Sequence, residues 1–264
     1  MNLELPLCLT KILYSMIQIT NLHKEYAKKV VLENINLTIN DGEIYCLLGK
    51  NGVGKTTLIN IILDLIENES GSIQLLGKSH TDLETLDKSQ IGVVHENLAL
   101  IEEINGLDYL KFVGKIYNIP QETLSKRIND LINYFFEDDA TIKKSIGKFS
   151  TGMKKKIAFC AAVIHTPSIL ILDEPFSGLD PLVANQMVQF LQKYKRDDRT
   201  ILISSHDLTY IEKIATHIGV LDNKELVFNS SIKDFTENGE NHLDAALLSI
   251  LKPNDSQLEN LDWI

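Results

Sequence analysis

A glycine-rich segment near the start of the chain constrains its fold more strongly than any other feature. Residues 49–56, Gly-Lys-Asn-Gly-Val-Gly-Lys-Thr, match the pattern G-x-x-x-x-G-K-[ST] at every fixed position. The apolar, β-prone residues 43–48 precede this segment, and residues 55–65 repeat apolar side chains at helical spacing. A phosphate-binding loop lies between a strand and a helix of this kind, so the context fits one. The alternative interpretation of residues 49–56 is an ordinary Gly-rich turn between a strand and a helix.

The residue types of this loop suit the binding of a nucleotide. Glycines let backbone N–H groups approach a phosphate without Cβ clashes, and the start of the following helix adds a positive field. Lys55 can reach the β- and γ-phosphates, and the Thr56 hydroxyl can ligate Mg²⁺. The candidate nucleotide contacts in this loop are Gly49, Asn51, Gly52, Gly54, Lys55, Thr56 and Thr57.

Two adjacent acids follow a run of four apolar residues later in the chain. Residues 169–172 are Ile-Leu-Ile-Leu, and Asp173 and Glu174 come next. A buried strand carries such acids to the C-terminal edge of a parallel sheet, where ligands bind. There Asp173 can hold Mg²⁺ and Glu174 can polarise an attacking water. With the glycine-rich loop, these acids predict a Mg²⁺-dependent P-loop nucleotidase.

The hydrophobic pattern predicts an α/β fold with a mostly parallel sheet. Short β-branched runs alternate with helical patterns over residues 16–230, which we interpret as one domain. Strand signals vanish between 106 and 147, which indicates a helical subdomain inserted at about 97–165. We expect residues 1–15 to be an N-terminal extension and residues 231–264 to be an acidic tail with a helix near 243–251.

Composition excludes several classes of protein. The net charge of −10 argues against wrapping nucleic acid, which needs clustered Lys and Arg. Cys8, Cys46 and Cys160 have no C-x-x-C spacing, so we expect reduced thiols in a cytoplasmic protein. No apolar run approaches the roughly 20 residues of a membrane-spanning helix. If the protein acts at a membrane, we therefore expect it to do so through a partner protein.

Four further segments resemble the ATP-binding-cassette (ABC) transporter ATPases. Residues 149–153, Phe-Ser-Thr-Gly-Met, resemble their signature segment, and residues 174–181 resemble the segment that follows the base glutamate. Residues 204–207, Ser-Ser-His-Asp, resemble their switch-histidine segment. Tyr26 lies where the family carries an aromatic residue that stacks on adenine. The resemblance spans about 16–229, in the family's order and approximate spacing.

This resemblance implies a fold, a reaction and partners. The fold is a P-loop core with an N-terminal antiparallel β portion and an inserted helical subdomain. Ser150 and Gly152 would contact the γ-phosphate of ATP held by another subunit, and His206 would act with Glu174 in hydrolysis. Two subunits, as a homodimer or a pseudo-symmetric pair, would enclose two Mg-ATP and drive a separate membrane permease from the inner face of the cell membrane. The other possibility is a soluble ABC ATPase acting on ribosomes or DNA.

Two departures from the family pattern refine this interpretation. Glu96 takes a position where the family often has a Gln that ligates Mg²⁺, and a subset that exports bacteriocins and peptide antibiotics also carries Glu there. The Thr-Gly-Met variant of the signature likewise resembles the drug- and sodium-export branch. Lys154, Lys155 and Lys156 form a basic run that we interpret as a solvated helical face, not a nucleic-acid site.

Overall fold

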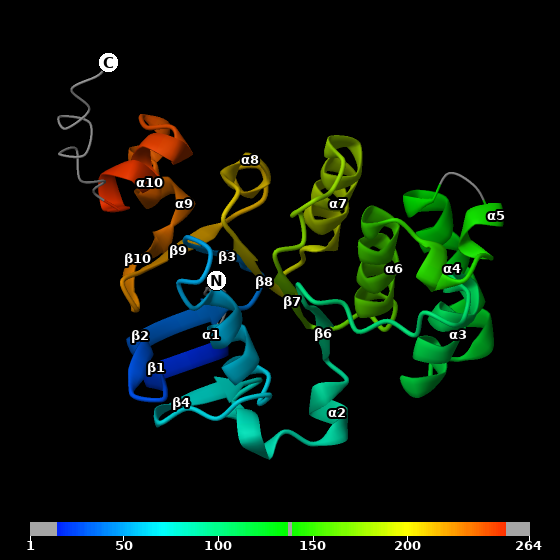
Figure 1. Ribbon diagram of the computed structural model, residues 1–264, viewed down its shortest axis with the longest axis horizontal. Helices are drawn as coiled ribbons and strands as arrows, with labels where there is room; N and C mark the ends of the chain where they lie inside the picture. The colour runs from blue at the N-terminus through cyan, green and yellow to red at the C-terminus, as the bar shows by residue number, and fades with distance from the viewer. Residues whose placement is uncertain (1–14, 137–138, 252–264) are drawn as a thin grey trace, which may run out of the picture.

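The computed structural model describes residues 15–136 and 139–251 (Figure 1). The expected N-terminal extension therefore lies outside the described residues except for Ser15, which is the first residue of a strand. The strands are β1 (Ser15–Tyr26), β2 (Lys29–Asn40), β3 (Ile44–Leu48), β4 (Ser70–Leu75), β5 (Lys78–Ser79), β6 (Ile91–Val94), β7 (Ile169–Asp173), β8 (Thr200–Ser205), β9 (His217–Asp222) and β10 (Glu225–Ser231). The α-helices are α1 (Lys55–Ile62), α2 (Thr85–Lys88), α3 (Gly106–Ile116), α4 (Gln121–Phe135), α5 (Asp139–Ile142), α6 (Thr151–Val163), α7 (Pro181–Tyr194), α8 (Leu208–Ile211), α9 (Ile232–Phe235) and α10 (Leu243–Leu251).

The central sheet has the strand order β10-β9-β3-β8-β7-β6, and only β10 pairs antiparallel with its neighbour. The central strands β3 and β7 are buried on both faces because helices or a second sheet cover each side. In β3, Ile44, Cys46 and Leu48 pack into one hydrophobic core, whereas Tyr45 and Leu47 pack into the other. Since β3, β7 and β8 run parallel, their C-terminal ends meet at one edge of the sheet.

A second sheet, with the order β2-β1-β4-β5, is antiparallel and contains the first strands of the chain. Alternate residues of β1, including Ile17 and Ile19, are buried against α1 and the central sheet. Figure 1 shows this sheet at the lower left, with α1 beside it. The two sheets confirm the predicted α/β class, with a mostly parallel sheet and an N-terminal antiparallel portion.

Helices alone connect β6 to β7 in the described part of the chain. Figure 1 shows α3, α4 and α6 together on the right, away from the antiparallel sheet. Phe135 of α4 and Phe159 of α6 pack edge to face, with ring centroids 5.5 Å apart. Helix α6 also lies against β6, so it belongs to the helical layer and to the central core at once. Helix α6 therefore connects the helical layer with the edge of the central sheet.

The C-terminal helix lies where the sequence places it, over 243–251. Leu243 and Ala246 of α10 are buried in the core that α6 and α7 share. Helix α8 ends at Ile211, and turns follow it. Among residues 15–136 and 139–251, no helix has the length and apolarity needed to cross a membrane.

Candidate functional site

The glycine-rich loop connects β3 to α1 at the C-terminal edge of the central sheet. Gly54 has φ of 119°, a conformation that residues with a Cβ rarely adopt. A Cβ on Gly49 would lie 2.6 Å from the carbonyl oxygen of Leu221, so that position also excludes a side chain. The Lys55 ammonium donates to the Gly49 carbonyl at 2.7 Å, which holds the loop around it. Backbone and lysine thus form a compact cradle at the start of α1.

A cavity of about 290 Å³ opens in front of this loop. Its lining joins the loop to two acids from distant parts of the sequence: Asn51, Gly52, Gly54, Lys55, Thr56, Thr57, Glu96 and Glu174. Exposed Glu96 follows β6, whereas Glu174 follows β7 and is only 5% exposed. The cavity therefore brings together two predicted metal ligands, Thr56 and Glu96, with the predicted base and most of the loop residues. The lining does not include Gly49, Tyr26, Asp173, Ser150, Gly152 or His206.

Asp173 ends β7, immediately before the lining residue Glu174, and is 1% exposed. The Ser204 hydroxyl donates a hydrogen bond to Asp173 Oδ1. The other oxygen, Oδ2, is buried without a hydrogen-bond partner among the described residues. A buried carboxylate oxygen without a donor is costly unless a cation or water satisfies it. Asp173 therefore fits a Mg²⁺ ion held near Thr56, since carboxylate and hydroxyl oxygens are hard ligands.

The protein side chains do not form a complete metal cage. Among the residues that the structure describes, no three His, Cys, Asp or Glu side chains are grouped to hold a metal ion. Mg²⁺ in nucleotide sites keeps few protein ligands and takes most of its oxygens from phosphates and water. Thr56 and Asp173 suit that arrangement, and the assignment of Glu96 as a further ligand stays a prediction.

The carboxylate of Glu174 contacts two of the predicted functional side chains. Its Oε1 lies 3.1 Å from the Lys55 ammonium, and its Oε2 lies 2.9 Å from His206 Nδ1. Its backbone has φ of 48°, a left-handed conformation that costs about 1–3 kcal/mol for a residue with a side chain. The Glu174 N–H donates to the hydroxyl of Ser204 at 3.0 Å, which helps to hold this conformation. The fold thus fixes Glu174 between the loop lysine and the histidine.

The signature-like segment forms the start of α6. The Ser150 hydroxyl accepts a hydrogen bond from the Met153 N–H at 3.3 Å and so caps the helix. A Cβ on Gly152 would meet only Leu179 Cδ2, at an ordinary 3.7 Å. Neither Ser150 nor Gly152 lines the cavity in front of the glycine-rich loop. This helix end therefore lies outside the cavity in front of the glycine-rich loop, and its role as an anion-binding position stays a prediction.

Tyr26 lies at the end of β1, apart from the other predicted site residues. It is 47% exposed, and the Lys24 ammonium lies 4.8 Å from the centroid of its ring. An exposed aromatic face of this kind can stack on a base, although Tyr26 does not line the phosphate cavity. Its contact with adenine stays a prediction.

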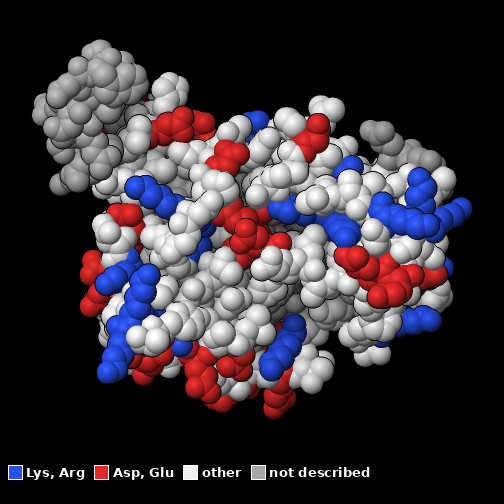
Figure 2. Space-filling model, in the orientation of Figure 1, with Lys and Arg blue, Asp and Glu red and all other residues white. Residues whose placement is uncertain are grey.

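The basic run in α6 is not the solvated face that the sequence indicated. Lys155 is only 7% exposed, and its ammonium donates to the Glu174 carbonyl at 2.9 Å. Lys154 forms an ion pair with Glu102, and the Lys156 ammonium lies 5.6 Å from the ring centroid of Phe136. Figure 2 shows basic side chains over the helical layer directly beside acidic ones. The interpretation of this run as uniformly solvated is therefore wrong for Lys155.

Sequence reasoning assigned no role to Ser204 and none to Lys155 as an individual residue. Ser204 contacts Asp173 and Glu174, and Lys155 contacts the backbone of Glu174. One signal for Ser204 was available, because parallel β7 and β8 bring their last residues to the same edge. The register pairs Asp173 with Ser204. No comparable signal marks Lys155, which is one of three adjacent lysines.

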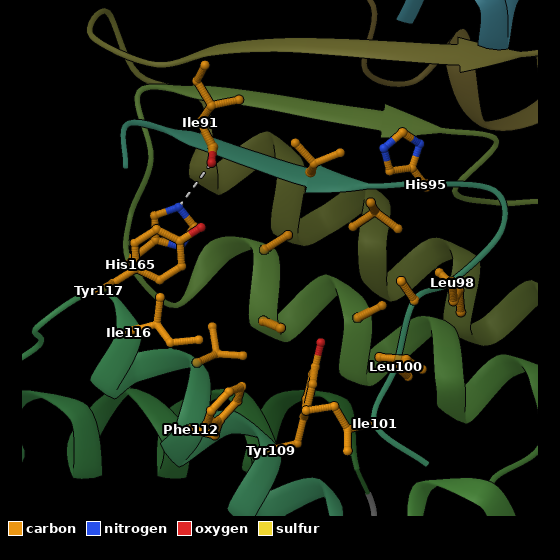
Figure 3. A pocket seen from close by; sticks show the side chains of 17 residues that line it. Ile91, His95, Leu98, Leu100, Ile101, Tyr109, Phe112, Ile116, Tyr117 and His165 are labelled. Atoms are coloured by element: carbon orange, nitrogen blue, oxygen red, sulfur yellow. Dashed lines mark hydrogen bonds between the residues drawn. The ribbon is translucent and has the colours of Figure 1, made fainter. Parts of the chain in front are cut away.

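A second cavity, of about 410 Å³, lies between β6 and the helical layer (Figure 3). We call it the β6 groove. Its lining is mainly apolar and includes Phe112, which is 46% exposed, and Tyr109 from α3. His165 stacks on Tyr117 at its end, with ring centroids 3.7 Å apart, and His165 Nε2 lies 3.4 Å from the Ile91 carbonyl. The groove is thus an apolar cleft, and one of its lining residues, His95, directly precedes Glu96 of the cavity in front of the glycine-rich loop.

Burial lowers the pKa of His165 to about 4, so this ring is neutral in the folded protein at pH 7. Its folded pKa lies below its unfolded value, and therefore stability falls as the pH drops from about 6.5 to 4. Allowing for partial exposure, we expect a loss of about 1–2 kcal/mol from this group. In His165→Phe, which keeps the stack on Tyr117, the free energy of unfolding should fall less between pH 7 and 4.5. Urea titrations test this, with exposed His242→Phe as the matched control; equal pH dependence in wild type and His165→Phe would contradict it.

Comparison with known proteins agrees with this geometry. A family model described as "ABC transporter" matches residues 32–177. The lantibiotic transport ATP-binding protein SrtF of Streptococcus pyogenes is 32% identical over 225 residues, which cover 85% of this chain and 94% of SrtF. The bacitracin transport ATP-binding protein BcrA of Enterococcus faecalis is 34% identical, over 83% of this chain and 70% of BcrA. A solved ATP-binding subunit of an ABC transporter superposes with a TM-score of 0.82 at 26% identity, over 89% of this chain and 99% of that one. The chain belongs to the ABC transporter family, and it is an ATP-hydrolysing subunit of that family.

Proposed function

We propose that two copies of this chain, or one copy and a similar partner, enclose two Mg-ATP and drive export through a separate membrane permease. The observation that carries this proposal is the separation of the two anion sites. Lys55 and the glycine-rich loop line one cavity, whereas Ser150 and Gly152 begin α6 outside it. A head-to-tail pair joins the loop of one chain to the α6 start of the other.

The side chains around the cavity support a division of labour in hydrolysis. Lys55 would hold the β- and γ-phosphates, and Glu174 would accept a hydrogen bond from the attacking water and take its proton. His206, which contacts Glu174, would orient that carboxylate and the γ-phosphate. Mg²⁺ held by Thr56 and Asp173 would neutralise charge on the phosphates. The water oxygen then bonds to the γ-phosphorus as the bond to ADP breaks, which releases ADP and phosphate.

The β6 groove is suited to bind a helical segment of a partner protein. An apolar cleft with aromatic walls suits the apolar face of a short helix. His95 lines this groove, and the next residue, Glu96, lines the nucleotide cavity. A permease segment in the groove would therefore touch the residue adjacent to the ATP site. The names of SrtF and BcrA describe transport of a lantibiotic and of bacitracin, which supports an exporter. A permease bound in the groove would hold the chain at the inner face of the membrane.

Phe112→Glu should release the chain from its permease. The substitution places a charge in an apolar groove, and the loss of an aromatic anchor costs about 2 kcal/mol or more, which is more than tenfold in affinity. The measurement is the fraction of tagged chain that sediments with membranes of the source cells. Val227→Glu is the matched control, because Val227 is 45% exposed and lies on β10, away from the groove. Equal membrane fractions for the two variants would remove the groove from the proposal.

A further inference from the structure

Lys155 is buried in α6 and bonds to the loop that carries the catalytic glutamate. Its ammonium donates to the carbonyl of Glu174 at 2.9 Å and to the carbonyl of Ser177. Both acceptors are backbone oxygens in the segment between β7 and α7. A lysine this deeply buried is unusual, and two carbonyl acceptors stabilise its charge. Lys155 thus joins α6 to the backbone of the loop.

The backbone of Glu174 is fixed from both sides. Its N–H donates to the carbonyl of Ser204 at 3.2 Å and to the Ser204 hydroxyl at 3.0 Å, while its carbonyl accepts from Lys155. The left-handed φ of 48° at this residue persists only where neighbouring contacts impose it. Ser204 belongs to β8, which is rigid in the sheet, whereas Lys155 belongs to a helix at the edge of the helical layer. Of the two restraints, Lys155 is the one that a shift of α6 can change.

The same helix begins with the signature-like segment. Ser150 caps α6, and Lys155 lies one turn after Thr151, the first helical residue. One helical turn is stiff, so a displacement at the start of α6 moves Lys155 with it. The loop ends at Asp180, whose carboxylate caps α7 through the Leu182 N–H at 2.8 Å, so a displacement of Lys155 would act on a segment whose far end is held by α7.

We propose that Lys155 is a positioning residue that couples engagement of α6 by the other subunit's nucleotide to the alignment of Glu174 in its own subunit. The inference rests on the proposed dimer, in which Ser150 and Gly152 meet a γ-phosphate across the interface. Phosphate binding at the start of α6 fixes the position of the helix. Through its hydrogen bond, Lys155 then fixes the position of the Glu174 carbonyl. Hydrolysis in one site thereby depends on occupancy of the other.

The charges around Lys155 agree with such a role. Burial lowers the pKa of Lys155, while the nearby charges of Glu174, Glu96 and Asp173 act in the opposite direction. Three of the acids at the nucleotide site thus favour the protonated amine. A protonated lysine keeps all three N–H donors, two of which the carbonyls of Glu174 and Ser177 use.

The test replaces Lys155 by Met, which has a similar shape and no donor, and by Gln, which keeps an N–H donor on a shorter side chain. We expect kcat of Lys155→Met to fall about 10- to 100-fold while KM for ATP changes less than about threefold, because misplacement of a base by an ångström has effects of this size. Lys155→Gln should recover part of the loss. Lys156→Met is the matched control, since that side chain contacts Phe136 and not the loop.

A second measurement needs no turnover. Amide hydrogen exchange in the segment 174–180 should be faster in Lys155→Met than in wild type, with exchange in β8 and the melting temperature unchanged. If wild type hydrolyses ATP and Lys155→Met matches its kcat and its exchange, the inference is overturned while the proposed function stands. If Lys155→Gln and Lys155→Met lose melting temperature and activity in parallel, the role is structural and the inference is overturned as well. Failure of the proposed function would give a different result: the Glu174→Gln variant would stay monomeric with ATP.

Discussion

Glu174→Gln should lower the rate of ATP hydrolysis by about 10²- to 10⁴-fold and convert ATP into an agent that holds two chains together. The amide keeps the size of the side chain but cannot take a proton from water. It also removes a negative charge next to the γ-phosphate position and the contact with Lys55, 3.1 Å away, so ATP binding should be retained or strengthened. Phosphate release gives the rate, and size-exclusion chromatography with light scattering gives the mass with Mg-ATP.

The matched control for this variant is Glu43→Gln. Glu43 also lies near a histidine, with 3.7 Å between its Oε1 and His217 Nδ1, but it does not line the nucleotide cavity. The Glu43→Gln variant should hydrolyse ATP as wild type does and show no stable ATP-bound dimer. Wild-type turnover in Glu174→Gln would remove that residue from the reaction. A monomer at saturating ATP would instead contradict the shared nucleotide sites.

The central sheet could be predicted because its strands are short apolar runs with clear ends. Residues 169–172, for example, form β7 with one residue of difference, because the strand includes Asp173. Parallel strands bring their C-terminal ends to one edge, so the glycine-rich loop, Asp173 and His206 had to converge there. The sequence therefore indicated which residues lie near one another, while their roles in hydrolysis stay predictions.

The sequence could not predict which polar side chains the tertiary fold buries. Lys154, Lys155 and Lys156 are chemically identical, and the helical period assigns an inward face only where apolar residues form one stripe. Helix α6 is buried on several sides, with Ile157, Phe159 and Cys160 all in the core, so its pattern shows no single inward direction. The burial of Lys155 follows from the loop after β7, which lies far away in the sequence.

The β6 groove shows the same limit. Its walls come from β6, α3 and α6, whose residues read separately as ordinary amphipathic or apolar segments. Phe112 is a large apolar residue on α3, yet it is 46% exposed because no element of the described chain covers that side of the helix. An exposed aromatic residue on a groove appears only after the helices are placed in space.

Gly152→Asp should abolish the ATP-dependent pair while leaving ATP binding by the single chain intact. Gly152 has room for a side chain, because its Cβ would meet only Leu179 Cδ2 at 3.7 Å. An aspartate in the first turn suits the helix dipole, so the helix itself should not be destabilised. At the proposed interface, however, its charge would lie against the γ-phosphate of the other subunit, and such like-charge contacts cost several kcal/mol.

The effect is best measured in the Glu174→Gln background, where the pair should be stable. Light scattering with Mg-ATP should then show a monomer, with an affinity between chains lowered by at least about 100-fold. Titration with a fluorescent ATP analogue, at chain concentrations low enough that both proteins are monomeric, should give an unchanged dissociation constant, because Gly152 does not line the chain's own cavity. Ser125→Asp, which adds the same charge at an exposed position of α4, is the control and should still form the pair. If Gly152→Asp dimerises as readily as Ser125→Asp, the start of α6 does not meet the partner's phosphate, and the head-to-tail arrangement must be rebuilt on other contacts.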